Sequence, residues 1–332
     1  MLTFGYLYDF RNPPQWYRRP AELYAETLDI IAGTEALGFA GAWLPEHHLA
    51  DDGYMPSPLV ALAAVAARTT SMRIGTAVAL APLHHPVRFA QDCALLDILS
   101  DGRLDIGLAI GYRQRETAAF GIDFTRRGAL FDEFLQIIGR LWAGETVDFD
   151  GTYFQIAGAK LMPSAPRGHI PLYIGGFAGK AVQRVATYGD GYLGTAEVCG
   201  LYVDKLRELG RDPAAARLRI TALTTVVARD PEQAMAELAP HYLHINNSYG
   251  QWNKEDNALG ITGMRPMSLE QYKASGELQI LTPEQAIAML TDLQQRTPLE
   301  HYIMLAPPGL PDDRFMAYAE VFATDVLPAF AR

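Results

Sequence analysis

Three consecutive residues that can exchange protons, Glu46, His47 and His48, follow a short apolar run over residues 40–44. A helix-like segment that ends at Gly38 precedes this run, so the run is predicted to be a strand and the three residues its C-terminal exit. Histidine titrates near neutral pH and can act as a general acid or base. Chemistry in α/β barrels collects at this end of the strands. Adjacent histidines are nevertheless more often structural than catalytic, so the interpretation depends on the surrounding segments.

The same side chains are also candidate metal ligands. His84 and His85 follow a later predicted strand, but they precede Pro86 and suit the entry of a helix, so we interpret them as supporting or capping residues. The chain has no HxH on its first strand and no HExxH motif. His301 begins the last predicted strand instead of ending it. A metal hydrolase is therefore the least favoured function, and we assign no metal ligands.

Small residues mark two other predicted strand exits. Gly75, Thr76 and Ala77 would let a flat surface approach the backbone, although tight packing in a narrow barrel would use the same residues. At residues 174–181 (IGGFAGKA) a strand ends in paired glycines and a helix begins at once. Bare N–H groups at such a helix start can bind an anion, and Lys180 would add a positive charge. A simple glycine turn between strand and helix explains this segment equally well.

The fourth predicted strand exit, residues 107–113, partly resembles a glycine-rich nucleotide loop but lacks GxGxxG. Arg113 could contact a phosphate there, although an exposed arginine on a barrel rim is the commoner case. Aromatic residues mark other loops: Trp16 and Tyr17 follow the first strand, and Trp252 lies in a late irregular segment. We expect Trp16 and Trp252 to line a substrate pocket. The alternative is a loop that packs on its own aromatic rings.

Strand-like and helix-like segments alternate along the chain, without a low-complexity linker or a repeat of solenoid period. Eight strands with interleaved helices is the count of a (β/α)8 barrel, and an open doubly wound sheet is the competing architecture. We predict an α/β fold with one TIM barrel domain over residues 1–332. The strands are expected at residues 2–8, 41–44, 73–80, 103–110, 171–176, 191–195, 219–228 and 301–306, with a small hairpin at 147–156.

Residues 242–281 interrupt this alternation and show little periodicity. A segment of this length between barrel elements is typical of a lid over an active site. We therefore predict an insertion after the seventh strand that covers the C-terminal mouth. The alternative is an additional pair of helices that covers the side of the barrel.

Charge and composition exclude several classes of partner. The 332 residues carry a formal net charge of −10 and are 49% hydrophobic. This balance argues against nucleic acid or an anionic membrane as the main partner, since both require a basic surface. Two cysteines, Cys93 and Cys199, show no zinc spacing, and no segment has the pattern of a signal peptide or a membrane span. A reduced, cytoplasmic protein is expected.

Several of these segments, taken in order along nearly the whole chain, resemble the bacterial luciferase-like flavin monooxygenases. Residues 242–281 match this family least. The motifs that carry the resemblance are EALGF at 35–39 with WLPEHH at 43–48, IGTAV at 74–78, HPVR at 85–88, LDILSDGR at 96–103, AFG at 119–121, IGG at 174–176 and GDG at 189–191.

The resemblance implies that reduced FMN binds at the C-terminal ends of the strands and reacts with O₂ to give a C4a-peroxide that oxidises an organic substrate. It implies that His47 and Glu46 are the catalytic residues, with Glu46 as the flavin-side neighbour of His47. It also implies that the Ala77–Val78 peptide bond is cis and supports the isoalloxazine ring, and that the phosphate lies on the turn at residues 176–180. The expected cofactor-binding residues are Ala77, Val78, Gly111, Tyr112, Gly175, Gly176, Phe177, Ala178, Gly179 and Lys180.

Departures from the family pattern affect the expected phosphate site. Ile110 stands where luciferase has an arginine, Ala109 replaces a neighbouring cysteine, and Ala178 replaces a hydroxyl residue. Backbone N–H groups, Lys180 or Arg113 would have to compensate. Many relatives hold flavin loosely and receive it reduced from a partner reductase.

We therefore expect a flavin-dependent monooxygenase that acts on a small organic molecule with O₂ and a possible flavin reductase. The alternatives are an F420-dependent hydride-transfer oxidoreductase and a non-catalytic flavin-binding protein of the same fold. The family usually forms homodimers, and apolar residues at 58–68 and 87–100 favour such pairing.

Overall fold

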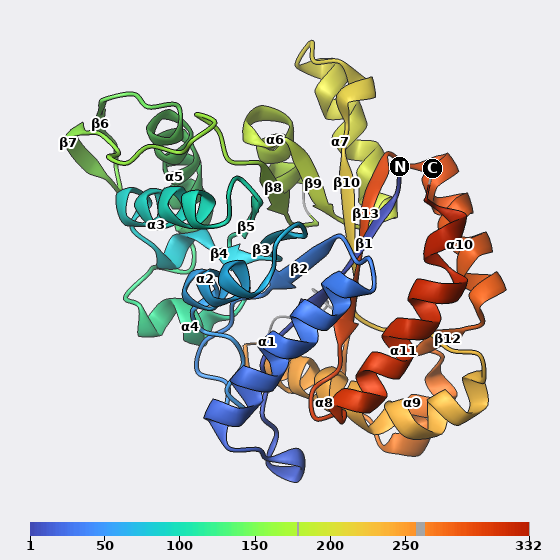
Figure 1. Cartoon of the computed structure of the whole chain (residues 1–332). Coiled ribbons are helices and arrows are strands. Elements are labelled where there is room, and N and C mark those ends of the chain that lie inside the picture. The colour runs from blue at the N-terminus through green and yellow to red at the C-terminus, as the bar shows by residue number, and fades with distance from the viewer. Residues whose placement is uncertain (178, 257–262, 332) are drawn as a thin grey trace.

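A closed parallel barrel forms the centre of the computed structural model, which describes residues 1–177, 179–256 and 263–331. The sheet closes because β3, at one end of the strand order, also pairs with β5 near the other end (Figure 1). The predicted eight-stranded α/β barrel is therefore confirmed. Its strands, in order around the barrel, are β1 (Thr3–Tyr8), β2 (Gly41–Leu44), β3 (Arg73–Thr76), β5 (Leu104–Ala109), β8 (Leu172–Gly175), β9 (Gly191–Gly194), β10 (Leu218–Ala222) and β13 (Leu299–Ala306).

Helices surround the barrel, and several begin with proline, whose fixed φ and missing N–H suit the first helical turn. Two helices in the C-terminal part of the chain begin with capping boxes, Ser268 with Gln271 and Thr282 with Gln285. The helices are α1 (Pro20–Ala36), α2 (Pro58–Arg68), α3 (Pro86–Leu99), α4 (Gln114–Ala119), α5 (Arg127–Trp142), α6 (Gly179–Tyr188), α7 (Ala196–Glu208), α8 (Pro231–Glu255), α9 (Leu269–Ser275), α10 (Pro283–Arg296) and α11 (Asp312–Asp325).

A break in the third strand shapes one side of the barrel mouth. The chain leaves β3 at Thr76, passes through a cis Ala77–Val78 peptide bond and resumes as β4 (Ala79–Leu80), which pairs with the end of β5. The cis bond is at the position that the family resemblance implied. The predicted hairpin is also present as β6 (Val147–Asp150) and β7 (Gln155–Ala159).

The prediction of a single seventh strand over residues 219–228 was wrong, because two strands occupy this segment. The strand breaks after Ala222, and β11 (Thr225–Val227) leaves the barrel to pair in parallel with β12 (Gln279–Leu281). A continuous apolar run does not distinguish one strand from two that turn into different sheets.

The prediction that residues 242–281 are irregular was also wrong for the first part of this segment, because α8 continues to Glu255. Asp230 caps its start by accepting a hydrogen bond from the Gln233 N–H at 3.0 Å. The C-terminal half of α8 contacts residues that follow β1 and β2, as described below. Residues 257–262, which belong to the predicted insertion, lie outside the described residues. In the described parts of the chain, no helix is long and apolar enough to cross a membrane.

Candidate active site at the barrel mouth

His47 follows β2 and is held by a carboxylate from another strand exit. Its Nδ1 donates to Glu116 Oε1 at 2.9 Å, and the same oxygen accepts the His48 backbone N–H at 2.9 Å. Burial raises the pKa of Glu116, but the hydrogen bonds from His47 and the His48 N–H, together with the Arg113 charge, outweigh burial and lower that pKa. Because Nδ1 is engaged, Nε2 is the nitrogen available to a ligand. This arrangement suits an acid/base histidine with a fixed ring orientation.

Aromatic rings enclose the His47 imidazole. Tyr54 and Trp252 lie with ring centroids 4.8 and 5.2 Å from it, and Tyr249 and Tyr112 lie 5.7 and 5.9 Å away. The hydroxyls of Tyr54 and Tyr249 are 2.9 Å apart, so they link the loop after β2 to α8. The predicted wall residue Trp252 is therefore beside His47, together with three tyrosines.

Glu46 is buried and connects the histidine segment to the broken third strand. Its carboxylate accepts from Nε2 of His48 and of His84, each at 2.9 Å, and from the Leu80 backbone N–H at 2.7 Å. Burial would raise its pKa, but these hydrogen bonds prevail and lower the pKa of Glu46 to about 2. Glu46 therefore stays ionised, and its bonds fix the segment that carries His47 against the third-strand break. His84 has the supporting position predicted for it.

Small residues from three strand exits meet beside the cis bond. A Cβ on Gly175 would lie 3.4 Å from Val78 Cγ1 and 3.7 Å from the Ala109 Cβ. Gly111 stands against Leu80. Most positions in the neighbouring strands are buried, whereas the predicted cofactor-binding residues here are partly exposed: Ala77, Val78, Gly111, Tyr112, Gly175 and Gly176. The structure thus groups these six around one accessible stretch of backbone.

The fifth-strand exit continues this surface. Gly176 has φ 137°, and a Cβ there would lie 2.7 Å from the Ala181 Cβ, so the turn requires glycine. Helix α6 begins at Gly179, and Gly179, Lys180 and Phe177 are exposed. Ala178, predicted to contact the phosphate, lies outside the described residues. The helix start and Lys180 offer N–H groups and a positive charge to an anion.

Arg113 lies at the mouth, but not at that turn. Its guanidinium carbon stacks 4.2 Å from the Trp252 ring centroid, and its Nη1 donates to the His48 carbonyl at 3.2 Å. Glu116 and Asp256 are its nearest carboxylates, at 3.5 and 3.7 Å. The sequence suggested that Arg113 could bind the cofactor phosphate in place of the missing hydroxyl residue. In the structure, its contacts are instead with residues of the His47 site.

A second buried cluster follows β1 and was missed by the sequence prediction. Arg11 Nε donates to Asp52 Oδ2 at 2.6 Å, and His244 Nε2 from α8 donates to the same oxygen at 2.7 Å. Asp9 Oδ1 accepts the Arg11 backbone N–H at 3.1 Å. The sequence prediction relied on the aromatic residues of this loop. The charged residues Asp9 and Arg11, which directly follow β1, indicated the position of the cluster better.

The other predicted wall residue, Trp16, lies farther along the same loop. It stacks on His241 with centroids 4.2 Å apart, and its recorded ring contacts are with His241 and His244. Trp16 has no ring contact with His47 among the described residues, so its role in a substrate pocket stays a prediction. Among the described residues, no group of three or more His, Cys, Asp or Glu side chains is arranged to hold a metal ion.

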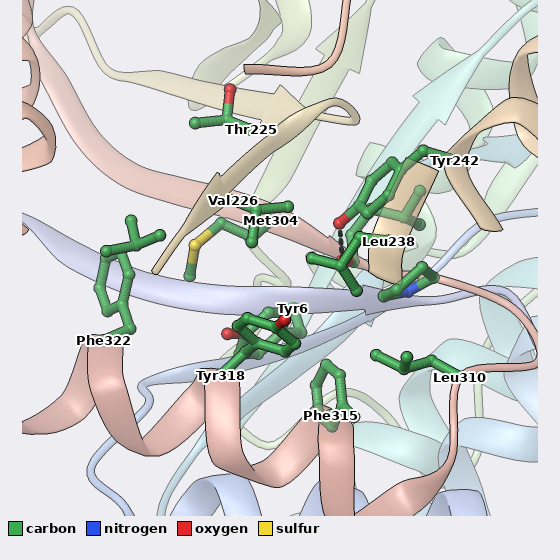
Figure 2. A pocket seen from close by; sticks show the side chains of 13 residues that line it. Tyr6, Thr225, Val226, Leu238, Tyr242, Met304, Leu310, Phe315, Tyr318 and Phe322 are labelled. Atoms are coloured by element: carbon green, nitrogen blue, oxygen red, sulfur yellow. Dashed lines mark hydrogen bonds between the residues drawn. The ribbon is translucent and has the colours of Figure 1, made fainter. Parts of the chain in front are cut away.

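A separate hollow lies outside the barrel wall, between β1, β13, β11 and α11 (Figure 2). Its lining is mostly apolar and includes Tyr6, Met304, Phe315 and Phe322. Tyr242 borders it and donates to the Leu305 carbonyl at 3.1 Å. None of the predicted catalytic or cofactor-binding residues lines this hollow, so we place the candidate site at the mouth.

Comparisons with known proteins identify the family of the chain. A family model described as luciferase-like monooxygenase matches residues 2–292. Limonene 1,2-monooxygenase of Rhodococcus erythropolis is 29% identical over 297 residues, which cover 85% of this chain and 76% of that protein. The F420-dependent glucose-6-phosphate dehydrogenase of Amycolatopsis mediterranei is 26% identical over 330 residues, covering 94% of this chain and 97% of that protein.

Solved structures show the same fold. The monooxygenase RslO1 from Streptomyces bottropensis has a TM-score of 0.81 at 23% identity, over 99% of this chain and all of that one (100%). This similarity concerns the fold, and the family match over most of the sequence carries the assignment. The chain therefore belongs to the luciferase-like monooxygenase family and is an oxidoreductase.

Proposed function

We propose that the protein is a flavin-dependent monooxygenase that uses reduced FMN and O₂ to oxidise a small organic substrate. The observation that carries this proposal is the position of His47: its Nδ1 is anchored by Glu116, and its ring borders Tyr112 at the exit that also presents Gly111. An acid/base group thus stands at the edge of the accessible backbone around the cis bond. Members of the same family with a monooxygenase name support this choice.

The residues at the mouth fit a flavin. The Ala77–Val78 backbone with Gly111, Gly175 and Gly176 would hold the flat ring, because these residues project little side-chain bulk. The start of α6 with Lys180 would hold the phosphate. When bound in its reduced form, flavin supplies the electrons that activate O₂.

The protein's own groups then have separate tasks. His47 would give or take a proton through Nε2, while Glu116 keeps the ring in place and stabilises its charged form. Glu46 would position the segment and not contact the substrate, because its two oxygens already accept hydrogen bonds from His48, His84 and Leu80. The rings of Tyr54, Tyr249 and Trp252 would exclude water from the reaction.

The test is an anaerobic titration of the purified protein with reduced FMN, followed by mixing with aerated buffer. We expect saturable binding and a rate of flavin oxidation that differs from that of free FMN. Absence of binding would refute the proposal. Binding with unchanged oxidation, and no turnover with any candidate substrate, would favour a flavin-binding protein.

An F420-dependent hydride transfer is the second candidate. The F420-dependent relative matches over nearly its full length, and Ile110 stands where an arginine would assist FMN. Parallel titrations with FMN and F420 separate the two, since tighter binding of F420 would favour hydride transfer without O₂.

We also infer that the protein pairs with a second copy of itself through α2 and α3, which pack against each other. These helices expose apolar side chains: Val60 is 75% exposed, Leu95 51% and Leu99 58%. Adjacent apolar residues of this exposure are typical of an interface. A sizing measurement that gives a monomer would contradict this inference.

A flavin reductase would be a separate partner that supplies reduced FMN. Turnover with chemically reduced FMN tests whether the enzyme requires such a reductase.

A further inference from the structure

Arg11 carries hydrogen-bond capacity that the described residues do not use. Its side chain is fully buried, and its Nε donates to Asp52 Oδ2 at 2.6 Å. Neither Nη1 nor Nη2 has a partner among the described residues, and the same holds for Asp52 Oδ1. Two donors and one acceptor of a single ion pair are thus buried and unpaired. Such groups are costly to bury, so they point to a ligand that pairs with them.

This ion pair shares its walls with His47. The Arg11 guanidinium carbon lies 4.9 Å from the Tyr54 ring centroid and 5.7 Å from that of Trp252. The His47 ring lies 4.8 and 5.2 Å from the same two rings. Arg11 and His47 therefore belong to one site. The ring centroids of Tyr54 and Trp252 lie 6.0 Å apart at an interplanar angle of 57°, so a planar ligand that reaches Arg11 would lie along the rings and not between them.

The charges around Arg11 disfavour an anion. Asp52 offsets the guanidinium charge within the ion pair, and Asp9 adds a second carboxyl group that accepts the Arg11 backbone N–H. Burial raises the pKa of Asp9 to about 7, although the Arg11 charge opposes this, so Asp9 is partly ionised at neutral pH. His244, bound to Asp52 Oδ2, is the remaining titratable partner. The negative charge of a carboxylate ligand would be repelled by Asp52 and by ionised Asp9, whereas an uncharged ligand would not be repelled.

We propose that Arg11 and Asp52 bind the organic substrate through an uncharged amide edge. The carbonyl oxygen accepts from the Arg11 Nη groups, and the adjacent N–H donates to Asp52 Oδ1. The plane of the ligand lies along Tyr54 and Trp252, next to His47. This assignment rests on the proposed function in one respect: it takes the bound ligand to be the substrate that the enzyme oxidises. A ligand without the N–H leaves Asp52 Oδ1 unpaired and is discriminated against.

The test is calorimetric titration of the intact protein with three aromatic probes: benzamide, benzoate and acetophenone. Benzamide has the acceptor and the donor, acetophenone has only the acceptor, and benzoate has only acceptors and a charge. We expect benzamide to bind at least about tenfold more tightly than either of the others, and Arg11→Met to remove that preference. Arg18→Met is the matched control, because Arg18 lies in the same loop and pairs instead with Glu26 and Asp312.

Asp52→Asn keeps the proposal testable if Arg11→Met does not fold. The amide oxygen that this substitution introduces can still accept from Arg11, but an NH₂ donor replaces Oδ1. The affinities for acetophenone and benzoate should therefore rise relative to the affinity for benzamide. The proposal is wrong if benzoate binds the unaltered protein as tightly as benzamide, if no probe binds, or if the order is the same in both variants. It is also wrong if FMN displaces benzamide, since the edge would then belong to the cofactor. FMN titrated in parallel reports on the proposed function separately, because loss of FMN binding leaves the benzamide preference intact.

Discussion

The two ends of the barrel contain similar buried groups but use them differently. At the N-terminal end, Arg219 donates to Asp105 and to Glu300, each at 2.9 Å, and stacks on Tyr173. At the mouth, Arg11 pairs with one carboxylate and leaves two nitrogens unpaired among the described residues. Both ends thus bury an arginine beside carboxylates and aromatic rings. Of these two arginines, only Arg11 has side-chain nitrogens without a partner among the described residues.

The histidines repeat this contrast. His301, near the start of β13, accepts from Trp43 Nε1 at 2.8 Å, and its Nδ1 lies 2.7 Å from Thr3 Oγ1. Burial, followed by the Arg219 charge, lowers the pKa of His301 well below its usual range, so this ring is neutral. His47 is fixed on one nitrogen by a carboxylate and is free on the other among the described residues. Full pairing is typical of a structural end of a barrel, and unused capacity is typical of the functional end.

The comparison predicts different costs for the same substitution at the two ends. Arg219→Met should lower the free energy of unfolding by about 3–5 kcal/mol, because it leaves buried carboxylates without their partner. Arg11→Met should cost less than about 2 kcal/mol, because Asp52 keeps its hydrogen bond from His244 and two buried donors that are unpaired in the described structure are removed. Urea denaturation of both variants measures the difference. Equal losses would contradict the contrast drawn above.

Replacing the mouth histidine should affect activity much more than stability. His47→Ala should reduce turnover supported by reduced FMN and O₂ by at least about a hundredfold, the usual contribution of a general acid or base. His85→Ala is the control, because His85 is exposed and lies at the start of α3. Steady-state turnover and thermal unfolding of both variants check this expectation. Turnover in His47→Ala close to that of the control would remove the catalytic role.

Asp9 should make stability depend on pH. Its pKa is raised to about 7 in the folded protein, so the folded state binds more protons than the unfolded state between about pH 4 and pH 7. Stability therefore falls as pH rises through this window. Relative to Asp9→Asn, the free energy of unfolding of the unaltered protein should decrease by about 2–3 kcal/mol between pH 5 and pH 8. Parallel pH dependences of the two proteins, measured in urea, would show that Asp9 does not titrate there.

The smallest expected effect concerns Glu116. Glu116→Gln keeps an oxygen that accepts from His47 Nδ1 but loses the charge that stabilises the protonated ring, so turnover should fall by about tenfold. The pH profile of turnover should shift to lower pH, which a purely structural change would not produce. Glu133→Gln, whose carboxylate accepts backbone N–H groups near the β6–β7 hairpin, serves as the control. An unshifted profile would assign Glu116 a structural role only.

The sequence allowed prediction of features that depend on local residue types. Alternating segments indicated the barrel, and the small residues of the third and fifth strand exits indicated two stretches of accessible backbone that the structure brings together. The link between His47 and Glu116 was not visible, since those residues are 69 positions apart and meet only when the barrel closes. The same applies to Arg11 and Asp52, which are 41 positions apart.

Helix α8 was missed for a related reason. Pro240 and polar residues disturb its periodicity, yet those polar residues have partners outside the helix. Asn247 donates to the Met267 carbonyl at 2.9 Å and accepts the Met267 N–H at 2.8 Å. Tertiary hydrogen bonds of this kind stabilise a helix that its own sequence pattern does not predict. The predicted role of residues 242–281 as a lid stays a prediction.

The central claim is that the mouth binds reduced FMN and directs its reaction with O₂ through His47. The most direct measurement is a stopped-flow experiment in which the anaerobic protein with reduced FMN is mixed with aerated buffer, in parallel with His47→Ala and with reduced F420. We predict that reduced FMN binds more tightly than reduced F420 and that the oxidation kinetics of the bound flavin change in His47→Ala. Tighter binding of F420, or oxidation kinetics identical to those of free FMN in both proteins, would contradict the account.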